Sequence, residues 1–126
     1  MRMTKTEAMF SSHSPYNNPY QGNDKRVLFV CSAGILRSAT AARIYASKYN
    51  TRAAGSEGYT LIPISKELLL WADEVIFVNR ENFNKVSESF DLESFNCKIK
   101  ILDIPDDYEH MDIELINHFK EQYENI

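Results

Sequence analysis

Two apolar runs, Val-Leu-Phe-Val at residues 27–30 and Val-Ile-Phe-Val at residues 75–78, contain no polar interruption. Such runs are typical of parallel strands that are covered on both faces of a sheet. A segment compatible with a helix follows each run, so strands and helices alternate along the chain. This alternation predicts a three-layer, doubly wound α/β domain with a four-stranded parallel sheet and helices on both of its faces.

Local patterns supply the remaining elements. Residues 98–102 alternate between polar and apolar side chains, which predicts a strand at the edge of the sheet. Three favourable N-cap side chains mark the expected starts of helices, namely Ser38, Asn79 and Asp112. The expected strands are 26–30, 51–54, 74–78 and 98–102, and the expected helices are 39–49, 65–72, one after Asn79 and one after Asp112.

Length and composition limit the class of protein. The chain has 126 residues, which suffices for a single domain, expected over residues 25–126. Residues 1–24 are polar and rich in turn-forming residues, so we expect a flexible arm outside the fold. The net charge of −4 argues against a nucleic-acid partner. No apolar run approaches ~18 residues and no apolar signal-peptide core opens the chain, so we expect a cytoplasmic protein with no membrane partner.

Cys31 directly follows the first apolar run and precedes the helix expected after Ser38. A loop between a strand end and a helix start turns backbone N–H groups inward, and the helix dipole adds positive potential, so this position predicts an anion site. The same surroundings stabilise a thiolate on Cys31. Arg37 carries a planar guanidinium that can hold two phosphate oxygens. Cys31 is therefore a candidate nucleophile, and the alternative is a buried, inert cysteine near an exposed arginine.

The pattern of Cys31, five residues, Arg37 and Ser38 resembles the phosphate-binding loop of the low-molecular-weight protein tyrosine phosphatases. The resemblance extends over residues 26 to about 125, and includes Ala-Ala-Gly-Ser at 53–56 and the segment 70–78. It implies that phosphate is bound by the loop residues Ser32, Ala33, Gly34, Ile35, Leu36, Arg37 and Ser38.

The loop departs from the family pattern Cys-x-Gly-Asn-x-Cys-Arg-Ser-Pro at three positions. Gly34 stands at the Asn position, Leu36 at the second Cys and Ala39 at the Pro. Gly34 is acceptable there because a left-handed backbone conformation costs glycine little. Leu36 removes the neighbouring thiol that could protect Cys31 as a disulfide.

The acidic segment Ile-Pro-Asp-Asp-Tyr at 104–108 resembles the segment of the same family that carries the general acid. The match places the acid at Asp106 and leaves Asp107 where the family has proline. Asp103 and Asp107 are the alternative proton donors. A solvated turn, or a weak metal loop with His110, is the alternative for the whole segment.

The resemblance implies a cysteine-dependent phosphatase that hydrolyses phosphomonoesters through a phosphocysteine intermediate. The expected substrate is a phosphotyrosine or another aryl phosphate, carried by a protein or a small molecule. Cys31, Arg37 and Asp106 would perform catalysis, and neither a metal nor a cofactor is implied. Tyr59 and Tyr108 are the candidates for an aromatic wall of the pocket.

Three other functions stay open on this scaffold. Cys-Ser-Ala-Gly at 31–34 also resembles the phosphocysteine loop of the IIB carriers of sugar-transport phosphotransferase systems, which typically lack equivalents of Arg37 and Asp106. An arsenate reductase needs a resolving thiol, for which this chain offers Cys97. The third alternative is a non-catalytic module that binds phosphate or phosphopeptides.

Overall fold

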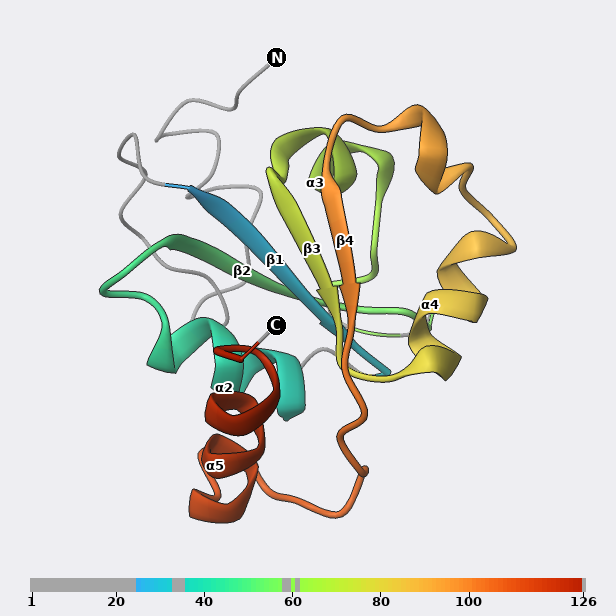
Figure 1. The fold of residues 1–126 in the computed structure, drawn as a ribbon. Helices are drawn as coiled ribbons and strands as arrows, with labels where there is room; N and C mark the ends of the chain where they lie inside the picture. The colour runs from blue at the N-terminus through green and yellow to red at the C-terminus, as the bar shows by residue number, and fades with distance from the viewer. Residues whose placement is uncertain (1–24, 33–35, 58–59, 61, 126) are drawn as a thin grey trace.

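The computed structural model describes residues 25–32, 36–57, 60 and 62–125, so the expected arm 1–24 lies outside the described residues. In the described residues, four strands form one sheet in the order β2-β1-β3-β4 (Figure 1). All three strand pairs are parallel. The strands are β1 (Arg26–Cys31), β2 (Asn50–Gly55), β3 (Glu74–Phe77) and β4 (Lys98–Ile101). The predicted parallel sheet is confirmed, and β4 occupies an edge, as its alternating sequence predicts.

The helices follow the strands in the predicted alternation. They are α2 (Arg37–Ile44), α3 (Lys66–Trp71), α4 (Arg80–Ser87) and α5 (Ile113–Gln122), with one 3₁₀ turn, η1 (Leu92–Ser94), before β4. Two predicted N-caps are confirmed: the Asn79 side chain accepts a hydrogen bond from Asn82 N, and the Asp112 side chain accepts one from Glu114 N. Each cap satisfies a backbone N–H that has no partner within its helix.

The predicted start and end of the first helix are wrong. The helix α2 begins at Arg37, its N-cap residue Leu36 makes no capping bond through its side chain, and it ends at Ile44 rather than at residue 49. Ser38 lies inside the helix, where its hydroxyl contacts the Cys31 thiol instead of a backbone N–H of the first turn. A serine near a helix start is usually a cap because of its local hydrogen bonding, but here a contact across seven residues takes its place.

Successive residues of β1 enter two separate hydrophobic clusters. Val27, Phe29 and Cys31 join the first cluster, which includes side chains of α2 and α5, whereas Leu28 and Val30 join the second, which includes side chains of α3 and α4. Because successive side chains of a strand point to opposite faces, the two clusters cover the two faces of the sheet. Figure 1 shows α2 and α5 together on one side of the strands.

Small side chains bring α2 close to the sheet. Ala39, Ala41 and Ala42 are buried in the first cluster, where α2 packs against β1 and β2. The ring of Tyr45, just after α2, stacks on Phe29 of β1 with 5.9 Å between centroids. This packing fixes the N-terminal turn of α2 over the carboxyl end of β1, where Cys31 lies.

A buried carboxylate, Glu74, lies at the opposite end of the sheet, in the first residue of β3. Its side chain is only 1% exposed and accepts a hydrogen bond from Tyr123 Oη at 2.8 Å. The ammonium groups of Lys25 and Lys100 lie 3.2 and 3.4 Å from its oxygens. Burial pushes the pKa of Glu74 upward, but the hydrogen bonds from Tyr123 and Lys25 and the charges of Lys25 and Lys100 outweigh it, so its pKa lies below the ordinary value.

The replacement Glu74→Gln is expected to lower the free energy of unfolding near neutral pH by about 1.5–3 kcal/mol, the usual worth of hydrogen bonds to a charged group. The folded-state pKa is depressed, so the stabilisation is complete above the unfolded-state pKa of about 4.3 and is lost as the pH falls through the folded-state pKa. Urea unfolding of both proteins across this pH range measures the difference. A difference that stays constant at every pH would contradict this account, and Glu121→Gln, an exposed carboxylate on α5, is the matched control.

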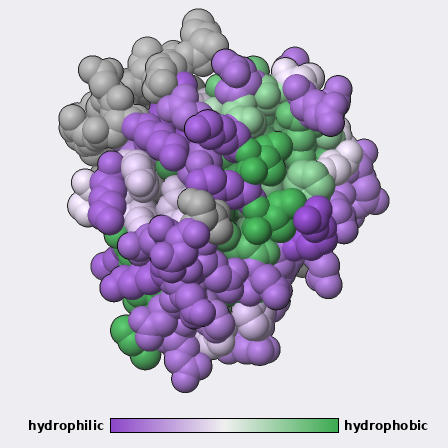
Figure 2. All heavy atoms as spheres, viewed as in Figure 1, coloured by the Kyte–Doolittle hydropathy of each residue, from purple (hydrophilic) through white to green (hydrophobic). Residues whose placement is uncertain are grey.

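Hydrophobic surface remains beside the edge strand. Figure 2 shows a hydrophobic patch over the region of β4. The half-buried hydrophobic side chains at the border of the second cluster include Phe83, Phe95, Ile99 and Ile101. Among the helices of the described segments, none combines the length and the hydrophobicity needed to cross a lipid bilayer.

Candidate functional site

The carboxyl ends of all four strands meet at one edge of the sheet, and each contributes a polar group there. Cys31 ends β1, Ser56 follows β2, and Asn82 lies in the first turn of the helix after β3. The segment 102–112 follows β4 and carries Asp106. In open α/β sheets this edge is where ligands bind.

The Cys31 thiol lies at the centre of this edge. Its Sγ atom is 3.1 Å from Ser38 Oγ, and both side chains are buried. Backbone bonds continue beyond the strands, because Ser56 N donates to Cys31 O at 2.7 Å and Glu57 N donates to Ser32 O at 3.2 Å. The strand pairing and the first turn of α2 therefore both fix the position of the thiol.

Arg37 is the first residue of α2, and its side chain is only 2% exposed. It links α2 to the residue after β1 and to the segment after β4. Its Nη1 donates to Ile104 O at 3.0 Å, and its Nη2 donates to Ser32 Oγ at 3.4 Å. Its Nε lies 3.5 Å from Asp106 Oδ1. The alternative that Arg37 is an exposed charge at the start of the helix is therefore wrong.

The three candidate acids occupy different surroundings. Asp106 faces the Arg37 guanidinium, and its own side chain is 66% exposed. The backbone of Asp103 instead pairs with the side chain of Gln122 on α5, through bonds of 2.6 and 2.8 Å. Asp107 is exposed. Of the three, Asp106 is the one that lies within 4 Å of Arg37.

The segment 102–112 is also held at its far end. Thr40 of α2 accepts a hydrogen bond from Met111 N at 2.8 Å, and its hydroxyl lies 3.5 Å from His110 Nδ1. Met111 has a φ of 63°, a left-handed conformation that is uncommon for a residue with a side chain. Bonds at Ile104 and at Met111 thus anchor this segment to α2 on both sides of Asp106.

Asn82 is a polar residue of this edge that the sequence interpretation missed. It is 2% exposed, and its Nδ2 atom donates to Ser32 Oγ at 3.2 Å and to Ser56 Oγ at 3.1 Å. The spacing of apolar residues along α4 identifies only the face of the helix that contacts the core, so it does not single out a polar residue such as Asn82. The Asn79 cap was the available signal, because it places residue 82 in the first turn, close to the carboxyl edge of the sheet.

Four predicted site residues, Ala33, Gly34, Ile35 and Tyr59, lie outside the described residues. The other aromatic candidate, Tyr108, is half-buried, and its hydroxyl lies 2.9 Å from His118 Nε2 on α5. Burial and the nearby carboxylates of Glu114, Asp107 and Asp112 raise the pKa of Tyr108.

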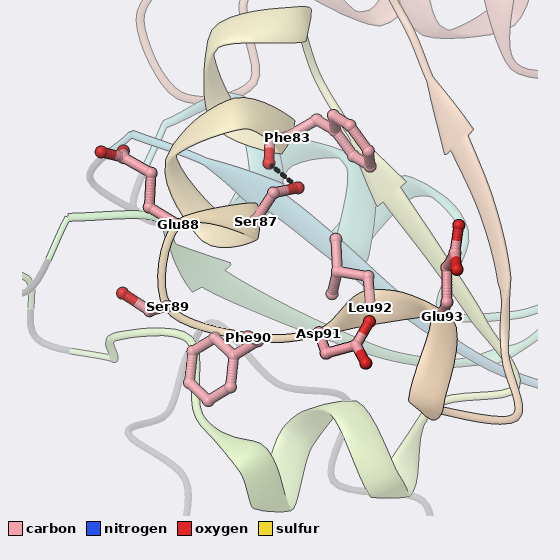
Figure 3. A pocket seen from close by; sticks show the side chains of 8 residues that line it. All are labelled: Phe83, Ser87, Glu88, Ser89, Phe90, Asp91, Leu92 and Glu93. Carbon is pink, nitrogen blue, oxygen red and sulfur yellow. Dashed lines mark hydrogen bonds between the residues drawn. The ribbon is translucent and has the colours of Figure 1, made fainter.

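A surface pocket of about 480 Å³ lies elsewhere, between the C-terminal end of α4 and η1 (Figure 3). Phe83, Phe90 and Leu92 give it an apolar lining, and Glu88, Asp91 and Glu93 add negative charge. The carboxylates make this pocket unfavourable for an anion. The polar edge around Cys31 therefore has the better chemistry for binding phosphate.

The two cysteines of the chain lie in different environments, and neither is part of a disulfide. Burial raises the pKa of Cys97, which lies just before β4. Cys31, in contrast, lies next to the N-terminal turn of α2 and to Ser38. Of the two, Cys31 is therefore the cysteine at the carboxyl edge of the sheet.

Comparison with known proteins gave no match: no family model, no curated protein and no solved structure was found to be similar to the chain. The case for a function therefore rests on the side chains at the carboxyl edge of the sheet.

Proposed function

We propose that the protein is a cysteine-dependent phosphatase that hydrolyses phosphomonoesters, with aryl phosphates such as phosphotyrosine as the substrate class. One observation carries the proposal: a buried thiol, a buried guanidinium and a carboxylate from three separate segments converge at the carboxyl edge of the sheet. A thiolate nucleophile, a phosphate-binding fork and a proton donor are what phosphoryl transfer to cysteine requires.

In the first step, the Cys31 thiolate attacks phosphorus and the bond to the leaving oxygen breaks. In its contacts with the described residues, Arg37 uses one N–H group on each of Nε, Nη1 and Nη2. Nη1 and Nη2 each carry a second hydrogen. These hydrogens hold two oxygens of the transferring group. Asp106 gives its proton to the leaving oxygen.

In the second step, water attacks the phosphocysteine and Asp106 takes the proton that the water loses. The S–P bond breaks, inorganic phosphate leaves, and the hydroxyl of Ser38, 3.1 Å from the sulfur, stabilises the returning thiolate. The polar groups are fixed before the substrate arrives, so they stabilise developing charge without reorganising.

The positions of the cysteines weigh against an arsenate reductase that uses an internal disulfide. Lys98 is in register with Glu74, and Glu74 with Val27, so Cys97 lies level with the start of β1. Cys31 is five residues further along, or about 16 Å at the usual rise of a strand. A disulfide needs Cα atoms within about 7 Å.

Hydrolysis of para-nitrophenyl phosphate by the wild-type protein without added metal tests the proposal. We expect steady turnover, and acid quenching during turnover should trap a phosphate on Cys31 that mass spectrometry locates. A phosphocarrier would instead keep a stable phosphocysteine and pass it on without steady turnover. A protein that binds phosphate and does not react would be the non-catalytic module.

The role of Asp106 gives a second expected result. Asp106→Asn removes the transferable proton and should lower kcat about 100-fold on a substrate with a poor leaving group, such as phenyl phosphate. The matched change Asp107→Asn should keep kcat within about twofold, because that side chain is exposed and outside the contacts of Arg37. The reverse result would assign the proton transfer to Asp107.

A further inference from the structure

The hydroxyl of Ser32 is held by two groups that can only donate hydrogen bonds. Asn82 Nδ2 donates to Ser32 Oγ at 3.2 Å, and Arg37 Nη2 donates to the same atom at 3.4 Å. A serine hydroxyl has two acceptor lone pairs and one hydrogen. With both lone pairs engaged, the hydroxyl has only its hydrogen left to share, and the partner must be an acceptor.

We propose that Ser32 is a side-chain donor to the bound phosphate, and that Asn82 is the positioning residue that directs its hydrogen toward the anion. This inference rests on the proposed function, because it takes phosphate as the anion. The Ser32 hydroxyl contacts the same Arg37 guanidinium that is proposed to hold the anion, so the two donors lie side by side.

Asn82 contacts both serines through the same atom, Nδ2. The side chain is almost fully buried, and Ser56 Oγ takes the second donor contact of Nδ2 at 3.1 Å. Its Oδ1 atom is buried and accepts no hydrogen bond from the described residues. The two serines, one after β1 and one after β2, therefore hold the amide through its nitrogen.

Inorganic phosphate is the probe, and its dissociation constant is measured by titration calorimetry, which does not require turnover. Ser32→Ala is expected to weaken binding about tenfold, as is usual for a lost hydrogen bond to a charged group. Asn82→Ala should weaken it by a similar factor, because the hydroxyl loses its direction. The double variant should bind no worse than Ser32→Ala alone, since the two residues act as one unit.

A charged replacement sharpens the test. Asn82→Asp keeps the shape of the side chain but replaces the donors with an acceptor, which takes the Ser32 hydrogen for itself. Phosphate binding should then be weak, and a further Ser32→Ala change should have no effect. Asn84→Ala is the matched control, because Asn84 is exposed on the same helix and should leave the dissociation constant unchanged.

The outcomes separate this inference from the proposed function. A protein that binds phosphate with the coupled losses but has no turnover would support the inference and overturn the phosphatase proposal. Turnover with additive losses, or with an unchanged dissociation constant in Ser32→Ala, would overturn the inference alone. A wild-type protein that does not bind phosphate would overturn both.

Discussion

Cys31→Ser should abolish hydrolysis of para-nitrophenyl phosphate, with a loss of at least about 1,000-fold in kcat. A serine hydroxyl is a much weaker nucleophile than a cysteine thiolate unless a general base activates it. Phosphate binding should stay within about threefold of wild type, because Arg37, Ser32 and Ser38 are unchanged and provide the binding energy.

The matched control is Cys97→Ser, the same substitution at the other end of the sheet. It should leave kcat within about twofold of wild type, since Cys97 lies outside the proposed site. Full activity in Cys31→Ser would contradict the assignment of the nucleophile. Loss of activity in Cys97→Ser with retained folding would instead point to a role for both thiols.

Arg37→Lys is expected to lower kcat/KM at least about 100-fold, although the charge is kept. An ammonium cannot bind two phosphate oxygens side by side, and it cannot also keep the contacts to Ile104 O and Ser32 Oγ. The phosphate dissociation constant should rise together with the loss of rate, because the fork contacts both the bound substrate and the transition state. Steady-state kinetics and calorimetry of the same preparations measure the two effects.

Arg43→Lys provides the control for this substitution. Arg43 is exposed in the last turn of the same helix, so this change tests the effect of replacing an arginine in α2 on folding. Its activity and melting temperature should match wild type. Activity in Arg37→Lys equal to that of Arg43→Lys would show that Arg37 is only a structural link between α2 and the segment after β4.

The parts of the fold that were predicted correctly depend on local patterns. The uninterrupted apolar runs predicted β1 and β3 because a strand covered on both faces needs apolar side chains on both. The alternation of polar and apolar residues from Lys98 to Ile101 predicted an edge strand, because such a strand needs apolar side chains on only one face. The start of α2 was predicted wrongly because Ser38 is bonded to Cys31, and no local pattern records that contact.

The site was predictable only where a side chain carries its own chemistry. Cys31, Arg37 and Asp106 have reactive or charged groups, and the structure brings Arg37 close to Asp106. Asn82 was missed because an amide in a helix has no chemical signature until the two serines beside it are known. The Ile104 carbonyl is a backbone group, which every residue has, so no sequence pattern could single it out.

The hydrogen bonds at Ile104 and Met111 hold the segment that carries Asp106 in place within the folded chain, before any substrate binds. Fixing a backbone residue removes roughly 1–2 kcal/mol of conformational entropy. In this protein that loss occurs during folding, since both anchors are bonds within the chain. A substrate would therefore meet the proposed acid, Asp106, in a segment that is already ordered, and its binding energy would not be needed to order that segment.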